Sequence, residues 1–170
     1  GIRRYVLGET KLPSVTSILD ATKSEEDKAA LANWRERTGY KEAEAISKAA
    51  SSRGSQMHSY LESYILGREN LSFFEENEQY KKMAKEIIDK GLTNRLEEVY
   101  GVECTMVYPM KYAGTADCVG LYEGKETIID FKQSNKPKKV EYIDSWFLQT
   151  AAYSLAHNIV HNSNITACVI

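Results

Sequence analysis

The chain has 170 residues and a formal net charge of −2, with 22 Lys and Arg side chains against 24 Asp and Glu. Hydrophobic residues make up 42% and charged residues 27%, a balance typical of a globular domain that excludes a disordered chain. We therefore predict one domain over residues 1–170 with no membrane span. Any DNA-binding surface must be a local basic patch, because the whole chain carries no net positive charge.

Residues 1–100 are predicted to be mainly helical. The apolar spacing and capping residues predict helices at 15–19, 25–37, 40–67 and 78–100. Ser24 and Asp27 form a capping box at the start of the second helix, which ends near Gly39. Residues 51–54 are a weak point of the third helix, and Gly91 is the expected interruption of the fourth.

From residue 101 the periodicity changes to that of strands. Strands are predicted at 102–109, 112–122 and 126–132, followed by a crossover helix at 140–161 and a strand at 165–170. The third strand is apolar on both faces at Thr127, Ile128 and Ile129, which predicts cover on both sides of the sheet. The crossover helix is apolar nearly all round, so we expect it to be mostly buried. The predicted fold class is α/β, with a mixed central sheet flanked by helices.

Two carboxylates on neighbouring strands are the candidate centre for chemistry. If residues 123–124 form a two-residue hairpin loop, Tyr122 pairs with Lys125 and Asp117 lies directly opposite Asp130. Directly opposed Cβ atoms are about 4.5–5.5 Å apart, a separation at which both carboxylates can bind one Mg²⁺ ion. A one-residue slip of the register would send Asp117 to the other face of the sheet.

Three further segments supply polar side chains to this region. Lys132 shares a strand face with Asp130 and could position a water molecule and stabilise developing negative charge. His58, on a predicted helix, is an additional ligand if that helix packs against the hairpin. Gln149 and Tyr153 share one stripe of the crossover helix. For each of these the alternative is an ordinary solvated or hydrogen-bonded side chain.

In this order along the chain, these motifs resemble the RecB-like exonuclease branch of the PD-(D/E)xK nuclease superfamily. The residues that carry the resemblance are Gly54 and His58, Asp117, residues 130–132, and Gln149 with Tyr153. Residues 12–16, 34–39 and 112–117 narrow it to the mitochondrial genome maintenance exonuclease family and its phage relatives. There are two departures: Ala116 stands in place of the proline in the superfamily's name, and Gln133 stands where many relatives have threonine.

The resemblance implies a restriction-endonuclease-like core and a Mg²⁺- or Mn²⁺-dependent exonuclease that hydrolyses DNA from the ends of single strands. The implied metal ligands are one imidazole, two carboxylates and one backbone carbonyl, from His58, Asp117, Asp130 and Phe131. Lys132 would be the catalytic lysine and would act with the two aspartates, while Gln149 and Tyr153 would position the substrate. Glu103, on the first of the three strands, is a less secure candidate for the metal region.

Two basic groups are candidates for binding the DNA backbone. One is the lysine cluster that includes Lys136, directly beyond the proposed site, and the other is Arg35 with Arg37 beside Trp34. We expect the helical region before the sheet to form a cap or arch through which only single strands pass. The default interpretation of both basic groups is a solvated face.

The chain is expected to be an intracellular monomer. It has three cysteines without CxxC spacing, which favours buried thiols over disulfides or a zinc site, and it opens with no signal-peptide pattern. The predicted location is the cytoplasm of a bacterium or a phage-infected host, or the mitochondrion if a targeting segment precedes the chain.

Three alternatives remain open for function. A structure-selective endonuclease on the same fold would use every residue of the site. A non-catalytic nucleic-acid-binding module would share the fold, although Asp117, Asp130 and Lys132 are all retained. An α/β interaction domain would carry these charges incidentally.

Overall fold

The structure is a computed structural model that describes residues 3–68, 78–134 and 136–170. Its central sheet has the strand order β3–β4–β5–β6. The antiparallel strands are β3 (Leu96–Tyr108), β4 (Tyr112–Tyr122) and β5 (Lys125–Ile129), and β6 (Ala167–Val169) runs parallel to β5. A separate hairpin pairs β1 (Arg4–Leu7) with β2 (Thr10–Pro13).

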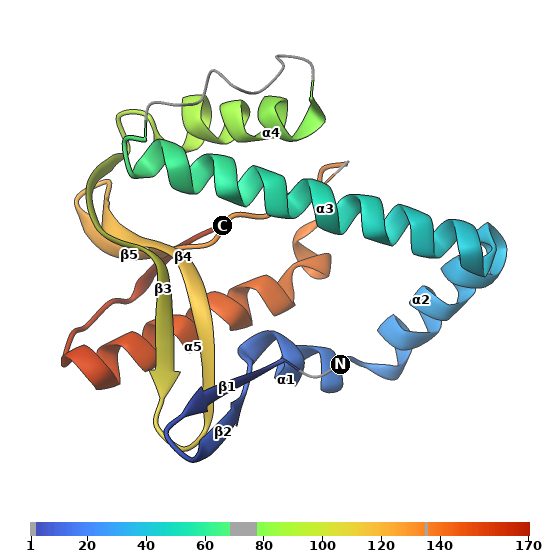
Figure 1. Ribbon diagram of the computed structural model, residues 1–170, viewed down its shortest axis with the longest axis horizontal. Helices are drawn as coiled ribbons and strands as arrows, with labels where there is room; N and C mark the ends of the chain where they lie inside the picture. The colour runs from blue at the N-terminus through green and yellow to red at the C-terminus, as the bar shows by residue number, and fades with distance from the viewer. Residues whose placement is uncertain (1–2, 69–77, 135) are drawn as a thin grey trace.

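Helices cover both faces of the central sheet (Figure 1). The long helix α3 (Tyr40–Ile65) and α4 (Gln79–Ile87) lie on one side. On the other side lies α5 (Asp144–His161), with α1 (Val15–Ala21) beside it. Helix α2 (Glu25–Thr38) connects α1 to α3 at the far end of the molecule. The chain is therefore a mixed α/β protein, as predicted.

Two apolar cores lie on the two faces of the sheet. The core beneath α3 and α4 contains Cys118 and Ile129, whereas the core beneath α5 contains their neighbours Val119 and Ile128. This division follows from the alternation of side chains along a strand. Thr127 is also buried, which confirms the prediction that this strand is covered on both sides.

The prediction that residues 1–100 are mainly helical needs three corrections. The chain begins with the β1–β2 hairpin, whose turn contains Gly8 at a φ of 59°. Helix α3 runs through residues 51–54 without interruption, since its packing against other elements outweighs the weak local propensity. The fourth helix ends in a π-helical turn, Ile88–Leu92, that contains Gly91, and β3 begins at Leu96 because it pairs with the full length of β4.

The prediction that the crossover helix is mostly buried is wrong. A 3-10 turn, Val140–Tyr142, precedes α5, and the outer face of α5 carries Phe147, Leu148 and Leu155 with exposures of 49%, 59% and 56%. The sheet covers only one face of this helix. The covered face carries several polar side chains, among them Gln149, and these side chains are therefore buried.

Two further predictions are answered by local structure. Ser24 caps α2 as expected: its hydroxyl accepts the backbone N–H of Asp27 and donates to the Asp27 carboxylate. Of the three free cysteines, only Cys118 is buried, so the expectation of three buried thiols is wrong.

Within the described residues, no helix combines the length and apolar character needed to cross a bilayer.

Candidate active site

Asp117 and Asp130 lie where the pairing of β4 and β5 ends. Residues 123–124 form the predicted two-residue turn, with φ values of 46° and 73°, and Tyr122 pairs with Lys125. The two strands pair without a bulge from Tyr122–Lys125 to Cys118–Ile129, the pair next to the two aspartates. The predicted turn and the register of these five residue pairs are therefore confirmed, and the strand pairing ends one residue short of Asp117 and Asp130.

The Asp117 carboxylate is held by two partners from different elements. Its Oδ1 lies 3.1 Å from Nδ1 of His58 on α3, and its Oδ2 accepts a hydrogen bond from the backbone N–H of Phe131. The second bond ties the middle of β4 to the segment that follows β5. It fixes the carboxylate so that its first oxygen points toward α3.

The Asp130 carboxylate points toward α5 and the segment beyond β5. It forms an ion pair with Nζ of Lys132 and accepts a hydrogen bond of 3.1 Å from Nε2 of Gln149. Only 2% of Asp130 is exposed, and this burial raises the pKa of its carboxyl group, although the charge of Lys132 opposes the shift. Asp117 and Asp130 are thus adjacent, but they bind different partners.

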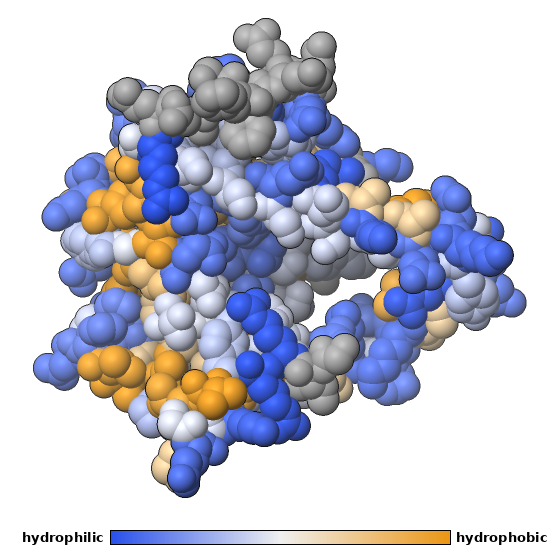
Figure 2. Space-filling view, viewed as in Figure 1, coloured by the Kyte–Doolittle hydropathy of each residue, from blue (hydrophilic) through white to orange (hydrophobic). Residues whose placement is uncertain are grey.

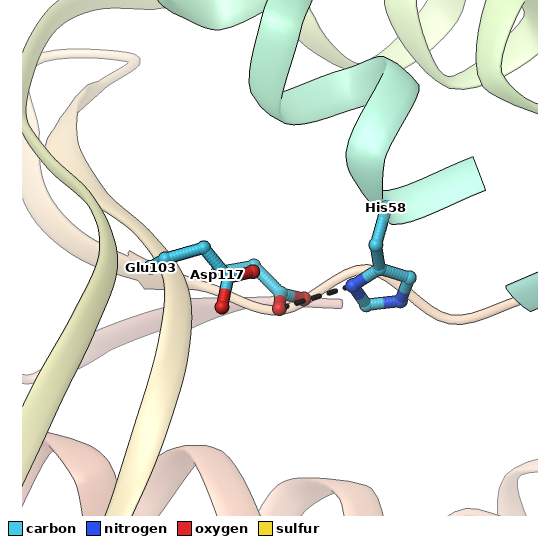
Figure 3. Close-up of side chains that lie close together, drawn as sticks. All are labelled: His58, Glu103 and Asp117. Carbon is cyan, nitrogen blue, oxygen red and sulfur yellow. Dashed lines mark hydrogen bonds and ion pairs between the residues drawn. The ribbon is translucent and has the colours of Figure 1, made fainter. Parts of the chain in front are cut away.

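Three ligand-type side chains converge on one side of the sheet. His58 from α3, Glu103 from β3 and Asp117 from β4 each offer one ligand atom, and these atoms lie within 4.8 Å of one another (Figure 3). His58 and Asp117 belong to the metal-binding set that the resemblance implies. Glu103 joins them in this cluster of side chains, and Asp130 is not part of it.

Glu103 reaches this position through an unusual backbone conformation. It faces Asp117 across the hairpin, between the pairs Val102–Cys118 and Cys104–Ala116. Its φ of 50° lies in the left-handed region, which costs a residue other than glycine about 1–3 kcal/mol. The predicted strands imply a two-residue loop at 110–111, and counting back from it would place Glu103 opposite Cys118. In the structure Tyr108 pairs with Tyr112, and this three-residue loop places Glu103 opposite Asp117.

The electrostatics of the cluster favour a bound cation. Burial raises the pKa of Glu103, and the negative charge of Asp117 raises it further. Burial by itself would lower the pKa of His58, but the hydrogen bond and the negative charge of Asp117 outweigh it, so that the pKa of His58 is raised. A cation among these groups would stabilise the ionised carboxylates and the neutral imidazole.

Gln149 connects the lysine to the interior of the molecule. Its Oε1 accepts a hydrogen bond of 3.1 Å from Lys132, and its Nε2 donates to Asp130 and, over 2.9 Å, to the hydroxyl of Tyr153. Burial raises the pKa of Tyr153 to about 12. Gln149 therefore holds Lys132 and Asp130 in fixed positions relative to each other.

Gly114 on β4 is required for the position of Tyr153. A Cβ atom at residue 114 would lie 2.3 Å from Cε1 of the tyrosine ring. We expect Gly114→Ala to displace Tyr153, to break its bond with Gln149 and to destabilise the fold by about 1–3 kcal/mol. Thermal unfolding measures this loss.

Gly54→Ala is the matched control for this substitution. Its added Cβ would lie 3.7 Å from the Gln133 side chain, which is ordinary contact, and alanine is the better helix former. Its melting temperature should equal or exceed that of the wild type. Equal stability of both variants would show that Tyr153 moves without cost.

A cleft of about 620 Å³ contains these groups. His58, Asp117, Asp130, Lys132, Gln149 and Tyr153 all line it, as does Glu103. The predicted DNA-binding residues are arranged differently. Trp34, Arg35 and Arg37 lie on α2, away from the cleft lining, and Lys136 is exposed on the segment that follows Lys132.

Sequence reasoning missed two groups of cleft residues. The first is Gln133, which accepts a hydrogen bond from Arg53 and donates to the carbonyl of Ala50, so that it joins the segment after β5 to α3. The second is Arg3 with Tyr5, from the N-terminal hairpin. Gln133 directly follows the motif at residues 130–132, but its contacts with α3 depend on the packing of distant elements, as does the position of Arg3 and Tyr5.

Comparison with known proteins adds evidence that is independent of this geometry. The chain is similar in sequence to mitochondrial genome maintenance exonuclease 1. It is 34% identical to the Mus musculus protein over 140 residues, which are 78% of the chain and 40% of that protein. It is 32% identical to the Homo sapiens protein over 167 residues, which are 90% of the chain and 45% of that protein.

The chain thus spans less than half the length of these exonucleases. The Xenopus tropicalis protein of the same name is 32% identical over 171 residues, which are 90% of the chain and 45% of that protein. No protein-family profile matches the chain. The similarity supports a relationship to exonucleases.

Proposed function

We propose that this chain is the catalytic part of a metal-dependent DNA exonuclease with a restriction-endonuclease-like core, acting on single-stranded ends. The observation that carries the proposal is the convergence of His58, Glu103 and Asp117 beside the Asp130–Lys132 pair in one cleft. The similarity to genome maintenance exonucleases supports the same reaction.

The donor set fits a hard divalent cation. Carboxylate oxygens are preferred ligands of Mg²⁺ and Mn²⁺, and imidazole is a common additional ligand. We infer that His58, Glu103 and Asp117 would hold such an ion, with Asp130 and the carbonyl of Phe131 as nearby candidates. When bound, it would polarise a phosphoryl oxygen and lower the pKa of a water molecule.

The residues of the chain supply positioning and charge stabilisation. Lys132 reaches into the cleft as an ammonium group, where it can orient the attacking water and stabilise the negative charge that develops on the phosphate. Asp130 and Gln149 hold its Nζ, so the ammonium is placed before the substrate arrives. Gln149 and Tyr153 form the wall that fixes this arrangement.

The preference for single strands is supported by the shape of the molecule. Helices α2 and α3 form an arm at one end, and Figure 2 shows an open space between this arm and the rest of the chain. Arg35 and Arg37 are exposed on the arm, and Trp34, directly before Arg35, is partly buried. We propose that a single strand passes beneath the arm to the cleft, with the arm's cations contacting its phosphates.

Digestion of end-labelled DNA tests this function. We expect Mn²⁺ or Mg²⁺ to support release of short products from a linear single strand, with no digestion in EDTA. A blunt duplex of the same sequence should be resistant, and equal cleavage of it would contradict passage beneath the arm. A circular single strand should remain intact, because nicking of the circle would indicate an endonuclease.

A further inference from the structure

The N-terminal hairpin is attached to the strand that carries Asp117. Ser14, directly after β2, pairs with Ala113 on β4, and the hydroxyl of Tyr5 lies 2.9 Å from Oγ1 of Thr115. Thr115 precedes Asp117 by two residues on the same strand. The hairpin therefore has a fixed position at the edge of the cleft, which Figure 1 shows beside β4.

Arg3 is held at the wall of the cleft by this hairpin. Its guanidinium carbon lies 5.1 Å from the centre of the Tyr5 ring, a cation–π contact. Its backbone carbonyl accepts hydrogen bonds from the Ser14 N–H and, over 3.3 Å, from the Ser17 hydroxyl. The backbone and the charged group are thus both positioned by neighbouring elements, although the side chain itself is exposed.

The charge of Arg3 faces an acidic cleft. Glu62, Glu103, Asp117 and Asp130 line the same cleft, and Arg3 is close enough to Glu103 to oppose the rise in the pKa of that carboxyl group. A DNA strand entering this cleft must overcome repulsion between its phosphates and the carboxylates. Among the cations that line the cleft, Lys132 is already paired with Asp130.

We propose that Arg3 binds a backbone phosphate of the DNA strand next to the phosphate that is cleaved, and that Tyr5 is the positioning residue for its guanidinium. This inference rests on the proposed function, since it takes a single strand as the ligand of the cleft. Guanidinium suits this role because it forms two parallel hydrogen bonds to a phosphate. The hairpin is then one wall of the DNA-binding site.

Binding of a fluorescent oligothymidylate of about 10 nucleotides tests the role of Arg3. Anisotropy is measured in Ca²⁺ and in EDTA at several salt concentrations. Arg3→Ala should weaken binding about tenfold and reduce the slope of log affinity against log salt by about 0.7, the value for one phosphate contact on a single strand. Unchanged affinity and slope, or no binding by the wild type, would overturn the inference.

Arg4→Ala is the matched control. Arg4 is the next residue along the chain, is exposed and, unlike Arg3, does not line the cleft. The variant loses the same charge, so non-specific attraction falls equally in both proteins. Its salt slope should remain close to that of the wild type, and equal effects of the two substitutions would show that Arg3 acts only through net charge.

Variants of Tyr5 separate positioning from a purely structural role. Tyr5→Phe keeps the ring beneath Arg3 and should retain most of the affinity, whereas Tyr5→Leu should weaken binding severalfold. When Arg3 is already alanine, Tyr5→Leu should have little additional effect, because the two residues act together. Additive losses would overturn the positioning role, and thermal melting identifies any variant that fails to fold.

Failure of this inference is distinguishable from failure of the proposed function. Cleavage of linear single strands by the wild type in Mn²⁺ reports the function, whereas the difference between Arg3→Ala and Arg4→Ala in binding reports the role of Arg3. Cleavage with identical binding of the two variants would leave the nuclease assignment in place and remove Arg3 from it.

Discussion

Lys132→Ala is expected to reduce the rate of DNA hydrolysis by about 10²- to 10⁴-fold, the range for loss of a group that moves protons or stabilises charge in the transition state. The Lys132 ammonium is held by Asp130 and Gln149 at the cleft and is partly buried, so water cannot replace it in the same position. Single-turnover cleavage of an end-labelled strand in Mn²⁺ measures the effect.

The Lys132→Ala variant should still bind Mn²⁺ although it has lost most of its cleavage activity. Mn²⁺ should still stabilise the protein, because the clustered ligands His58, Glu103 and Asp117 remain. Removal of the lysine also leaves the buried Asp130 without its cation, so some loss of stability is expected. Lys125→Ala, at the exposed first residue of β5 and remote from Asp130, is the control and should cleave at the wild-type rate. Near-normal cleavage by Lys132→Ala would remove the lysine from catalysis.

Asp117→Asn is expected to abolish the stabilisation of the protein by Mn²⁺ and to reduce cleavage to near background. For the wild type, an ion concentration 100-fold above its dissociation constant adds about 2.7 kcal/mol of stability. In a chain of this size that raises the melting temperature by about 5–10 °C. The variant should show little of this shift, because the amide replaces a charged ligand between His58 and Glu103.

The metal-free Asp117→Asn protein should be slightly less stable than the wild type. The carboxylate accepts the Phe131 N–H and contacts His58, and an amide offers one acceptor fewer, which costs about 1 kcal/mol. Relief of repulsion from Asp130 is a smaller effect, because Lys132 neutralises that charge. A higher melting temperature without metal would show that repulsion dominates.

Two further variants make the metal experiment specific. Asp89→Asn applies the same chemical change to an exposed carboxylate paired with Lys85, and its Mn²⁺ shift should match the wild type. Glu103→Gln should weaken the shift, because Glu103 belongs to the cluster. A full shift in Glu103→Gln together with its loss in Asp130→Asn would instead favour the ligand set that the resemblance implies.

The hairpin at the centre of the site could be predicted in detail from the sequence. The alternation of apolar residues and the Glu123–Gly124 turn depend on neighbours along the chain, so they determined the register that makes Asp117 and Asp130 adjacent. The same local rules predicted the cap of α2 and the cover on both faces of β5. These features are encoded within a few residues of where they occur.

The partners of each carboxylate could not be predicted in this way. Asp130 is bound by Lys132 and Gln149, while Glu103 joins Asp117 and His58 in the cluster. Which side chains bind each carboxylate depends on how far α5 and α3 lie from the sheet. That distance is set by packing over the whole molecule.

By itself, then, the sequence determined the strands, their register and the types of side chain available for chemistry, because periodicity and turn chemistry act locally. Only the tertiary structure decided that the N-terminal hairpin brings Arg3 to the cleft and that α2 keeps Arg35 and Arg37 away from it. It also decided that an apolar face of α5 stays exposed. Each of these outcomes depends on contacts between residues far apart in the chain, whose free energies no local pattern contains.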